Sequence, residues 1–458
     1  MIVCKFGGTS VQDAEAVERV AGIVRQRLKE RPVVVASAMG KTTNHLLQAA
    51  ASASKGKRTE ALDLVNKIKE KHFQEANRLG LPVSNGDELS AAIHSHFKEI
   101  VSIVKGLSAL GELTPRSMDA MASFGERLST LILTEAFLKR EIPAELMDAR
   151  QFIITDENFT RAAPLFDLTD AAICERVLPV VKAGRVPVFQ GFIGSTRSGI
   201  TSTIGRGGSD YSAAIVGAAL DAYDIQIWTD VDGIMTTDPR MVPEARRVKV
   251  ISFDEASELA YFGARVLHPA TILPAVRKKI PVHVLNSYRP EQGGTLITEE
   301  APPCDNPVKA IAYKKGITVI NITSTRMLMA HGFLKKIFET FDLHRTAVDV
   351  VSTSEVSVSL TLDETSALWD IVTELKKIGE VIVEGSKAIV CCVGDNLRNT
   401  PGVANRVFSA IQDVNIHMIS QGASAINITF VVDEDRLPQV VRSLHDVFFQ
   451  RLDPLTFE

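Results

Sequence analysis

The stretch IVCKFGGTS, residues 2–10, leads from a largely apolar run into two glycines and two hydroxyl side chains. A short apolar run that ends at a turn is typical of a buried strand. Gly7 and Gly8 then allow the backbone to bend sharply and to approach another group closely. In open α/β sheets, ligands lie beyond the carboxyl ends of the strands, so this stretch predicts such a sheet with a site at its edge.

Strands and helices alternate outward from this stretch to about residue 298. A helix is expected over residues 14–30, because Val17, Val20, Val24 and Leu28 recur on one face. A longer helical stretch reaches about residue 140. Further strands are expected at 32–37, 186–192, 224–230 and 280–286, with helices between them. This order predicts an α/β domain over residues 1–298 with a mostly parallel sheet.

Length and composition narrow the class of protein. A chain of 458 residues is expected to form two or three domains. The net charge of −4 offers no basic excess for nucleic acid, and no apolar run approaches the ~20 residues of a membrane span. We expect no signal or transit peptide, because the N-terminus enters a strand directly. The odd number of scattered cysteines predicts free thiols in a reducing, cytoplasmic compartment; they stand at 4, 174, 304, 391 and 392.

A repeat with a period of 70 residues follows a proline-rich, acidic linker at 299–307. GFLKKIFETFDLHRTAVDVVSTSEVSVSLTLD begins at Gly332, and GVANRVFSAIQDVNIHMISQGASAINITFVVD begins at Gly402. Each copy reads β-α-β-β-α-β, which gives repeats at 308–386 and 387–458. The second copy lacks a last strand, so we predict that strand 308–313 pairs with it and that the first copy is inserted within the second. The alternative is an isolated edge strand.

The KFGGTS segment (5–10) has the composition of a phosphate cradle. Lys5 supplies a positive charge, Gly7 and Gly8 supply backbone N–H groups, and Thr9 and Ser10 add hydroxyl donors. A tight turn without a ligand is the alternative. The Gly40-Lys41-Thr42 segment is not a Walker A loop, because Val35 stands where that motif needs a glycine.

The GRGGSDYSAA segment (205–214) places an arginine among glycines at the start of an apolar helix. Ser209 or Asp210 is the expected N-cap. A helix N-terminus with a glycine approach and Arg206 beside it is typical of an anion site. The alternative is an ordinary helix entry with a surface arginine.

Two further segments carry polar groups in apolar surroundings. WTDVDGIMTTDPR (228–240) ends a strand with acids and hydroxyls that suit a nucleotide or magnesium, although its dipeptides also occur in generic turns. SFGERLS (123–129) interrupts an apolar helix with Glu126 and Arg127. These two residues form either an exposed pair or a site in which a buried Glu126 points at a ligand ammonium.

Taken together, these segments resemble those of aspartate kinases in the amino acid kinase superfamily. FGARVLHPAT (262–271) and TSEVSVSLTLD (353–363) add to the likeness, which covers essentially the whole chain. The resemblance implies a three-layer α/β/α catalytic domain and two ferredoxin-like βαββαβ regulatory domains of the ACT type. The chain ends at Glu458, which leaves no room for a fused homoserine dehydrogenase, so a monofunctional, lysine-sensitive form is expected.

The resemblance also implies a reaction and its residues. ATP, with Mg²⁺, would phosphorylate the β-carboxylate of L-aspartate. Lys5, Asp210 and Arg206 would be catalytic, and no residue is expected to bind a metal directly. Aspartate would be held by Ser37, Thr43, Glu126, Arg206 and Ser209. The nucleotide would be held by Lys5, Gly7, Gly8, Thr9, Ser10, Gly208, Thr229, Asp230, Met235, Arg240, Arg265 and Val266. Some relatives carry tyrosine at position 235 and lysine at position 265.

The two repeats differ in charge, which predicts an effector site on the first. Asp349 and Glu355 align with Ile419 and Ala425 of the second copy. Two carboxylates in one pocket suit a ligand with two ammonium groups, such as L-lysine; the alternative is a pair of solvated strand-end acids. The expected lysine site comprises Met327, Ala330, Gly332, Phe333, Leu334, Val348, Asp349, Ser354 and Glu355. A homodimer through these domains is expected, with a tetramer also open.

Two other functions remain open from the sequence. The chain could be another amino acid kinase, acting on glutamate, N-acetylglutamate or a nucleoside monophosphate. It could also be a catalytically inactive amino-acid sensor. The repeat and the Glu126 and Arg206 pair disfavour the first alternative, and the presence of Lys5, Arg206 and Asp210 together disfavours the second.

Overall fold

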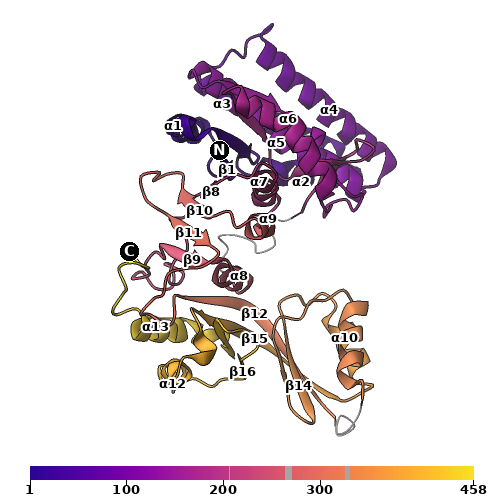
Figure 1. The fold of residues 1–458 in the computed structure, drawn as a ribbon. Coiled ribbons are helices and arrows are strands. Elements are labelled where there is room, and N and C mark those ends of the chain that lie inside the picture. Colours follow the sequence, from indigo (N-terminus) through magenta and orange to yellow (C-terminus); the bar gives the residue numbers. More distant parts are fainter. Residues whose placement is uncertain (206, 264–270, 325–330) are drawn as a thin grey trace. The chain divides into compact units, whose positions relative to one another are not determined.

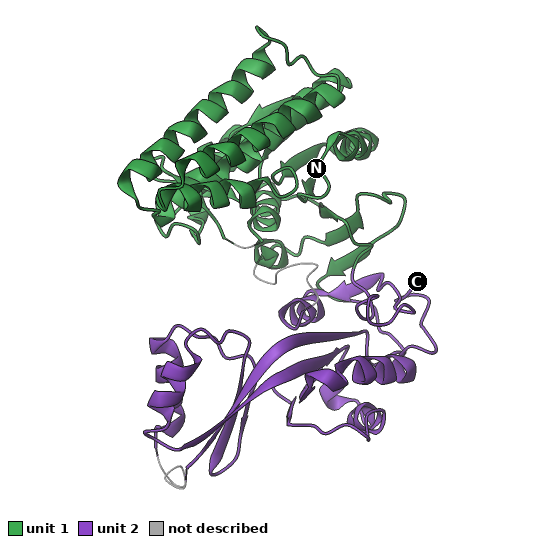
Figure 2. Ribbon diagram, turned by 180° about the vertical axis from the view of Figure 1, so that it is seen from behind, with its two compact units in different colours: residues 1–233, 266–300 green, residues 234–265, 301–458 purple. Residues whose placement is uncertain are grey.

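The computed structural model describes residues 1–205, 207–263, 271–324 and 331–458. The chain divides into two compact units, one of residues 1–233 and 266–300 and one of residues 234–265 and 301–458 (Figure 2). Within the described ranges, no helix is both long and apolar enough to cross a lipid bilayer.

The first unit is built on a mostly parallel sheet whose strands lie in the order β3-β5-β2-β1-β8-β10-β11. Only the β10–β11 pair in this series is antiparallel. The strands are β1 (Ile2–Phe6), β2 (Pro32–Ala36), β3 (Ala144–Met147), β5 (Val186–Gln190), β8 (Asp224–Thr229), β10 (Val282–Asn286) and β11 (Thr295–Thr298). The strands predicted near residues 2, 32, 186, 224 and 280 are thus confirmed. A small second sheet joins β4 (Ile154–Thr155), β6 (Ile193–Thr196) and β7 (Thr201–Thr203).

Helices cover both faces of the main sheet (Figure 1). Alternate side chains of β1 divide between these faces, because strand side chains have a period of two. Ile2, Cys4 and Phe6 join the core beneath α1 and α5, whereas Val3 lies near Gly217 of α7. The helices are α1 (Ala14–Gln26), α2 (Thr42–Ser54), α3 (Arg58–Arg78), α4 (Glu88–Leu110), α5 (Pro115–Lys139), α6 (Phe166–Lys182), α7 (Gly208–Ala219) and α9 (Leu273–Arg277).

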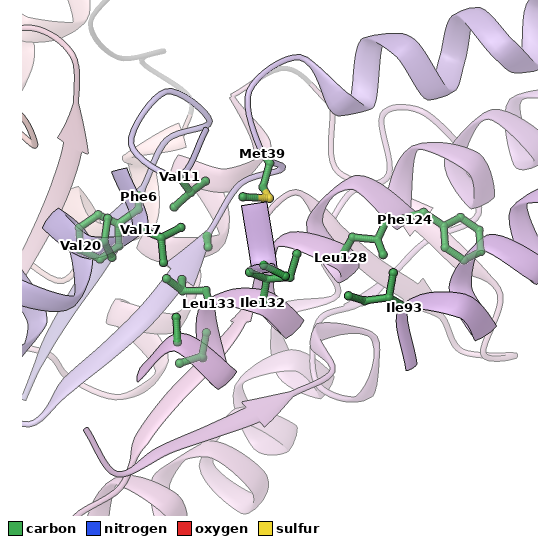
Figure 3. Close-up of a cluster of buried hydrophobic side chains, with 14 of the residues drawn as sticks. Phe6, Val11, Val17, Val20, Met39, Ile93, Phe124, Leu128, Ile132 and Leu133 are labelled. Carbon is green, nitrogen blue, oxygen red and sulfur yellow. The ribbon is translucent and has the colours of Figure 1, made fainter. Parts of the chain in front are cut away.

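The core between β1, α1 and α5 is apolar and closely filled (Figure 3). Val17 and Val20 of α1 lie near Phe6, and Ile132 and Leu133 of α5 lie below Met39 in the same view. Each fully buried aliphatic or aromatic side chain of this kind stabilises the fold by about 1.5–3 kcal/mol. This core holds β1 and α5 in place. It therefore also positions Lys5 of β1 and Glu126 of α5.

Helix α7 begins earlier than the sequence predicts. Its N-cap is Gly207, with a φ of 73°, and the helix starts at Gly208. The prediction that Ser209 or Asp210 caps it is therefore wrong, and both lie in the first turn. Glycine adopts the left-handed backbone without a Cβ penalty, so the chain enters the helix without a side-chain cap. The Ser209 and Asp210 side chains are bonded elsewhere.

The second unit carries an antiparallel sheet in the order β13-β14-β12-β15-β17-β16. Strands β12 and β15 span both repeats. Ala310–Lys314 pair with Ile389–Val393. Thr318–Thr323 pair with β14, and Val319–Thr323 also pair with the start of β15. This is the pairing that a first copy inserted within the second requires. The strands are β12 (Ala310–Thr323), β13 (Val351–Thr353), β14 (Ser357–Leu362), β15 (Glu380–Val393), β16 (Met418–Gln421) and β17 (Asn427–Asp433).

Helices cover this sheet in each repeat. The first repeat has a core of its own, in which Phe333, Ile337 and Phe341 of α10 pack against Ile320 and Leu360 of the sheet. The helices are α10 (Phe333–Leu343), α11 (Leu368–Leu375), α12 (Val403–Ser409) and α13 (Leu437–Phe448).

Residues 234–265 group with the regulatory repeats rather than with the predicted catalytic domain of residues 1–298. They include β9 (Val250–Ser252) and α8 (Phe253–Tyr261). Lys309 and Glu255 form an ion pair of 2.9 Å, with both side chains 2% exposed. The Ile311 N–H donates to Thr236 O (2.7 Å), and Asn427 Nδ2 donates to Glu258 Oε2 (2.7 Å). These long-range bonds were not predictable from the sequence.

Candidate active site

Lys5 and Asp210 form an ion pair at the carboxyl end of β1. Lys5 Nζ lies 2.6 Å from Asp210 Oδ1, and Lys5 is only 8% exposed. The central place of β1, between β2 and β8, brings Lys5 beneath the first turn of α7. A buried ammonium held by one carboxylate keeps donors that can serve an anion.

The glycine turn after β1 is set by close backbone approach. A Cβ on Gly8 would lie 3.1 Å from Ala38 O and 3.2 Å from Gly40 O. The Gly7 N–H donates to Trp228 O (3.0 Å), and the Gly208 N–H donates to Gly205 O (3.0 Å). Both N–H groups close turns in this structure, and the donation of Gly7 and Gly208 to phosphate stays a prediction.

The hydroxyl group of Ser10, a predicted donor to phosphate, is also hydrogen-bonded within the protein. It is 1% exposed, and its Oγ lies 2.8 Å from Ser287 Oγ and 3.3 Å from Trp228 O. Its N–H donates to Gly7 O (3.0 Å). Ser10 therefore stabilises the turn, and its contact with phosphate stays a prediction. The backbone of Gly8 and of the first turn of α7 is the stronger candidate for phosphate.

Glu126 is buried on α5, so the exposed-pair interpretation is wrong. The Ala38 N–H and the Thr43 hydroxyl donate to its Oε1, at 3.3 and 3.5 Å. Its Oε2 is buried and has no hydrogen-bond partner among the described residues. Burial raises the pKa of the Glu126 carboxyl to about 8. A buried acceptor without a partner is costly, which points to a donor supplied by a ligand.

These residues line one cavity of about 300 Å³ in the first unit. Ser37 Oγ donates to Ser209 Oγ across it, at 2.9 Å. Seven predicted site residues line it: Lys5, Ser37, Thr43, Glu126, Gly208, Ser209 and Asp210. Phe192, Gly205 and Gly207 also line it and were not predicted. The glycine-rich composition of 205–208 was the signal for the latter two. Arg206 lies outside the described residues.

The other predicted nucleotide residues are divided between the units. Thr229 and Asp230 end β8 in the first unit, where Thr229 Oγ1 donates to Asp230 Oδ1 (3.2 Å). Met235 and Arg240 belong to the second unit. Arg240 is exposed and pairs with Asp238 (2.8 Å). Arg265 and Val266 lie outside the described residues. Nucleotide binding by these residues stays a prediction.

The predicted effector acids occupy opposite ends of one hairpin. The Asp349 N–H donates to Thr361 O, whereas Glu355 is exposed in the turn that joins β13 to β14. Six residues of strand span about 20 Å. The prediction that one chain brings both carboxylates into one pocket is therefore wrong, because the hairpin register separates them.

Asp349 is already paired inside the second unit. Its Oδ1 accepts from Lys314 Nζ (2.9 Å) and from the Tyr261 hydroxyl (3.2 Å), and its Oδ2 is buried without a partner among the described residues. Burial raises the pKa of Asp349.

The remaining predicted effector residues have varied surroundings. Gly332 is the N-cap of α10, Phe333 is in the repeat core and Val348 packs against it. Leu334 is half-exposed, and Ser354 bonds Ser357. Met327 and Ala330 lie outside the described residues.

Comparison with known proteins identifies the family of this chain. The sequence profile of the amino acid kinase family matches residues 1–286, and that of an ACT domain matches residues 390–448. Aspartokinase 2, chloroplastic, of Arabidopsis thaliana is 40% identical over 476 residues, which cover 98% of this chain and 84% of that protein. The chain belongs to the aspartokinases. Lysine-sensitive aspartokinase 3 of Escherichia coli is 39% identical over 98% of this chain and 99% of its own.

Solved aspartokinase structures have the same fold. E. coli aspartokinase III in complex with aspartate and ADP, in an R-state, matches with a TM-score of 0.85 and 38% identity over 98% of this chain and 100% of that chain. The same enzyme in complex with lysine and aspartate, in a T-state, matches with a TM-score of 0.82 and 37% identity over the same shares. The expected fold of a kinase domain with ACT domains is confirmed. The chain is accordingly an aspartokinase, an enzyme that phosphorylates a carboxyl group.

Proposed function

We propose that this enzyme transfers the γ-phosphoryl group of MgATP to the β-carboxylate of L-aspartate, giving ADP and 4-phospho-L-aspartate. The observation that carries this assignment is one cavity that is lined both by the Lys5–Asp210 pair and by Glu126, whose Oε2 has no hydrogen-bond partner among the described residues. Within that lining Lys5 suits an anion and Glu126 suits an ammonium group. ATP use is supported by the relative solved with ADP.

The chemistry requires no catalytic base. The β-carboxylate of aspartate has a pKa near 3.9 and is ionised at neutral pH. One of its oxygens attacks the γ-phosphorus while the bond to the β–γ bridging oxygen breaks and ADP leaves. Two anions must meet, so catalysis consists of positioning and charge neutralisation. Lys5 neutralises charge on the moving phosphoryl group, and Asp210 orients Lys5.

Substrate selection follows from the acid on α5. Glu126 takes the α-ammonium of aspartate through Oε2, and Arg206 takes its α-carboxylate in a bidentate contact. Ser37 and Thr43 lie beside the β-carboxylate, with Ser209 close by. Thr229, Asp230, Met235, Arg240, Arg265 and Val266 remain the candidates for the nucleotide, and Thr9 remains a candidate for its phosphates. Magnesium enters with the nucleotide as MgATP.

An acyl-phosphate assay tests this function. Hydroxylamine traps the product as a hydroxamate, and parallel reactions contain aspartate, glutamate or N-acetylglutamate with MgATP. We expect product from aspartate, at a rate at least about a hundredfold above that from N-acetylglutamate, because acetylation removes the charge that Glu126 binds. Equal rates with N-acetylglutamate would contradict the role of Glu126. No product from any of the three would favour an amino-acid sensor.

The same proposal places the enzyme at the start of the aspartate-derived pathway to lysine, threonine and methionine, with L-lysine as its feedback inhibitor. Lysine sensitivity is supported by the E. coli relative that is named for it and was solved with lysine. We place lysine at the first repeat, at a homodimer interface, because Asp349 has no acidic counterpart in the second repeat. The tetramer and the cytoplasmic location stay predictions.

A further inference from the structure

A buried acid outside the cavity holds the strand that leads into the cavity wall. Asp119 of α5 is 1% exposed and does not line the cavity. Its Oδ1 accepts from the Thr203 hydroxyl (2.7 Å), and its Oδ2 accepts from the Thr203 N–H (2.9 Å). Thr203 ends β7, two residues before Gly205. One carboxylate therefore fixes both the backbone and the side chain at the point where the wall begins.

The same carboxylate holds a second segment against that wall. Asp119 Oδ2 also accepts from the Thr160 N–H, at 2.9 Å. Thr160 has a φ of 71°, which is a costly conformation for a β-branched residue and persists only when its surroundings enforce it. A Cβ built on Gly205 would lie 3.4 Å from Thr160 O. The strained Thr160 backbone thus forms the surface on which Gly205 rests.

A fourth hydrogen bond joins the two segments directly. The Ala162 N–H donates to Thr203 O at 2.9 Å, so the two segments bonded by Asp119 also bond each other. Burial raises the pKa of Asp119. Three donors within 2.9 Å converge on one carboxylate and occupy three of its roughly four acceptor sites.

Helix α5 connects this arrangement to the substrate site. Asp119 and Glu126 are seven residues apart on one helix, which is two turns and about 10.5 Å. Residues with this spacing lie on the same face. Glu126 lines the cavity, and Asp119 bonds Thr203, which lies two residues before Gly205 of the same lining. A single helix therefore sets the separation between the Glu126 carboxylate and the part of the cavity wall formed by Gly205 and Gly207.

We propose that Asp119 is a positioning residue for the aspartate subsite. It holds Thr203 and Thr160 so that Gly205 and Gly207 of the cavity wall stand at the distance from Glu126 that aspartate spans. This role rests on the proposed function, since it assumes that Glu126 and the wall bind aspartate together. It predicts that loss of Asp119 weakens aspartate binding more than ATP binding, because Lys5, the β1 turn and the first turn of α7 are held by other contacts.

Two substitutions at Asp119 test the role. Asp119→Ala removes every acceptor, so we expect the KM for aspartate to rise about tenfold or more, with the KM for ATP within about twofold of wild type. Asp119→Asn keeps one oxygen for the two N–H groups, and its amide can donate to the Thr203 hydroxyl once that hydroxyl turns to accept. We expect Asp119→Asn to restore the KM for aspartate to within about threefold of wild type.

A matched control separates positioning from general stability. Asp224 is a buried acid at the amino end of β8 that bonds Gln226 and His283, away from the carboxyl ends where the cavity lies. Asp224→Ala should lower the midpoint of thermal unfolding without changing the ratio of the two KM values. If Asp119→Ala changes both KM values equally, or behaves as Asp224→Ala does, the positioning role is wrong.

A milder variant keeps the test decisive if Asp119→Ala does not fold. Thr203→Val removes only the hydroxyl bond, and we expect the KM for aspartate to rise about threefold with the KM for ATP unchanged. An unchanged KM for aspartate in Thr203→Val would then contradict the role. Wild-type enzyme that makes no acyl phosphate from aspartate would refute the proposed function itself, an outcome distinct from wild-type activity that Asp119 substitutions leave intact.

Discussion

At the scale of single residues, the protonation state of the Glu126 carboxyl depends on whether the cavity holds a ligand. Burial raises its carboxyl pKa to about 8, so it is largely protonated at neutral pH when the cavity holds no ligand. A bound ammonium favours the ionised form and lowers that pKa. Aspartate binding is therefore coupled to the release of a proton from Glu126.

This coupling predicts a pH dependence for aspartate alone. The KM for aspartate should fall by up to about tenfold per pH unit as pH rises toward 8, and should level off above it, because binding needs ionised Glu126. The KM for ATP should not follow this course. Initial rates from pH 6 to 9 would measure both, and Glu126→Gln should show a high KM for aspartate that no longer varies with pH. A pH-dependent KM in Glu126→Gln would contradict the assignment.

Stability should change in the opposite direction. The folded-state pKa of Glu126 lies above its unfolded value of about 4.5, so the folded protein retains a proton that the unfolded chain has lost. The contribution of this group to stability is therefore present below pH 4.5 and is lost as pH rises through 8. Thermal unfolding of ligand-free wild type and Glu126→Gln should give a difference between their midpoints that shifts in favour of Glu126→Gln from pH 6 to 9.

Residue types at the site were predictable where their chemistry shows in the sequence. Lys5, Glu126 and Asp210 are charged residues that interrupt apolar elements. Charged side chains are rarely buried unless they are paired, so their presence in such elements is informative. The hydrogen-bond partners of the residues around the site were not predictable from the sequence. Ser10 and Gly7 have the composition of a phosphate loop, yet both bond to Trp228 across the sheet. The role of Asp119 was missed as well, although a second acid seven residues before Glu126 was a visible signal.

At the scale of elements, the cavity depends on how closely α7 approaches the end of β5. A Cβ on Gly191, just after β5, would lie 2.8 Å from the Cα and 2.6 Å from the Cβ of Ser209. The absence of a side chain at Gly191 therefore sets where the first turn of α7 lies. That turn carries Asp210, the partner of Lys5.

Gly191→Ala should accordingly impair catalysis by moving α7. Overpacking of this kind costs about 1–3 kcal/mol, and we expect kcat/KM to fall at least about tenfold for both substrates. Gly106→Ala on α4 is the control, because a Cβ there meets nothing within 4 Å. Steady-state kinetics and thermal unfolding would measure both variants. Wild-type kinetics for Gly191→Ala would show that the position of α7 does not limit the reaction.

Element boundaries show where sequence patterns stop being informative. The apolar runs of β1, β2 and β8 identify buried strands directly, because both faces of a central parallel strand are covered. The start of α7 was misplaced because Gly207 enters the helix through a left-handed backbone rather than a side-chain cap. Residues 234–265 lie within the amino acid kinase match of residues 1–286, yet they group with the second unit through contacts such as the Lys309–Glu255 pair, whose partners are 54 residues apart.

At the scale of the whole molecule, the regulatory repeats share a skeleton but not a charge pattern. The 70-residue period and the missing last strand of the second copy predict the nested pairing of β12 with β15. Side-chain partners within a repeat do not follow from the period. Lys314, which lies before the first strand of the inserted copy, bonds both Asp349 and Asp363 of that copy.

The hairpin geometry makes the lysine prediction sharper. One chain cannot bring Asp349 and Glu355 to the same ligand, but a two-fold pairing of antiparallel hairpins can bring Asp349 of one copy near the opposite end of another. A lysine ammonium would then compete with Lys314 and Tyr261 for Asp349. Binding that favours a state with a poorer kinase site would inhibit the enzyme.

A lysine titration of kinase activity tests this arrangement. Removal of Asp349 forfeits a charge-assisted bond of about 1.5–3 kcal/mol, so Asp349→Ala should raise the half-inhibitory lysine concentration about tenfold or more. Ile419→Asp places an acid at the matching position of the second repeat and should leave that concentration unchanged. Lys314→Met removes the internal competitor and should lower it, a result that a solvated, unoccupied Asp349 could not give. Unchanged lysine sensitivity in Asp349→Ala, or no inhibition of wild type at millimolar lysine, would exclude the first repeat as a lysine site.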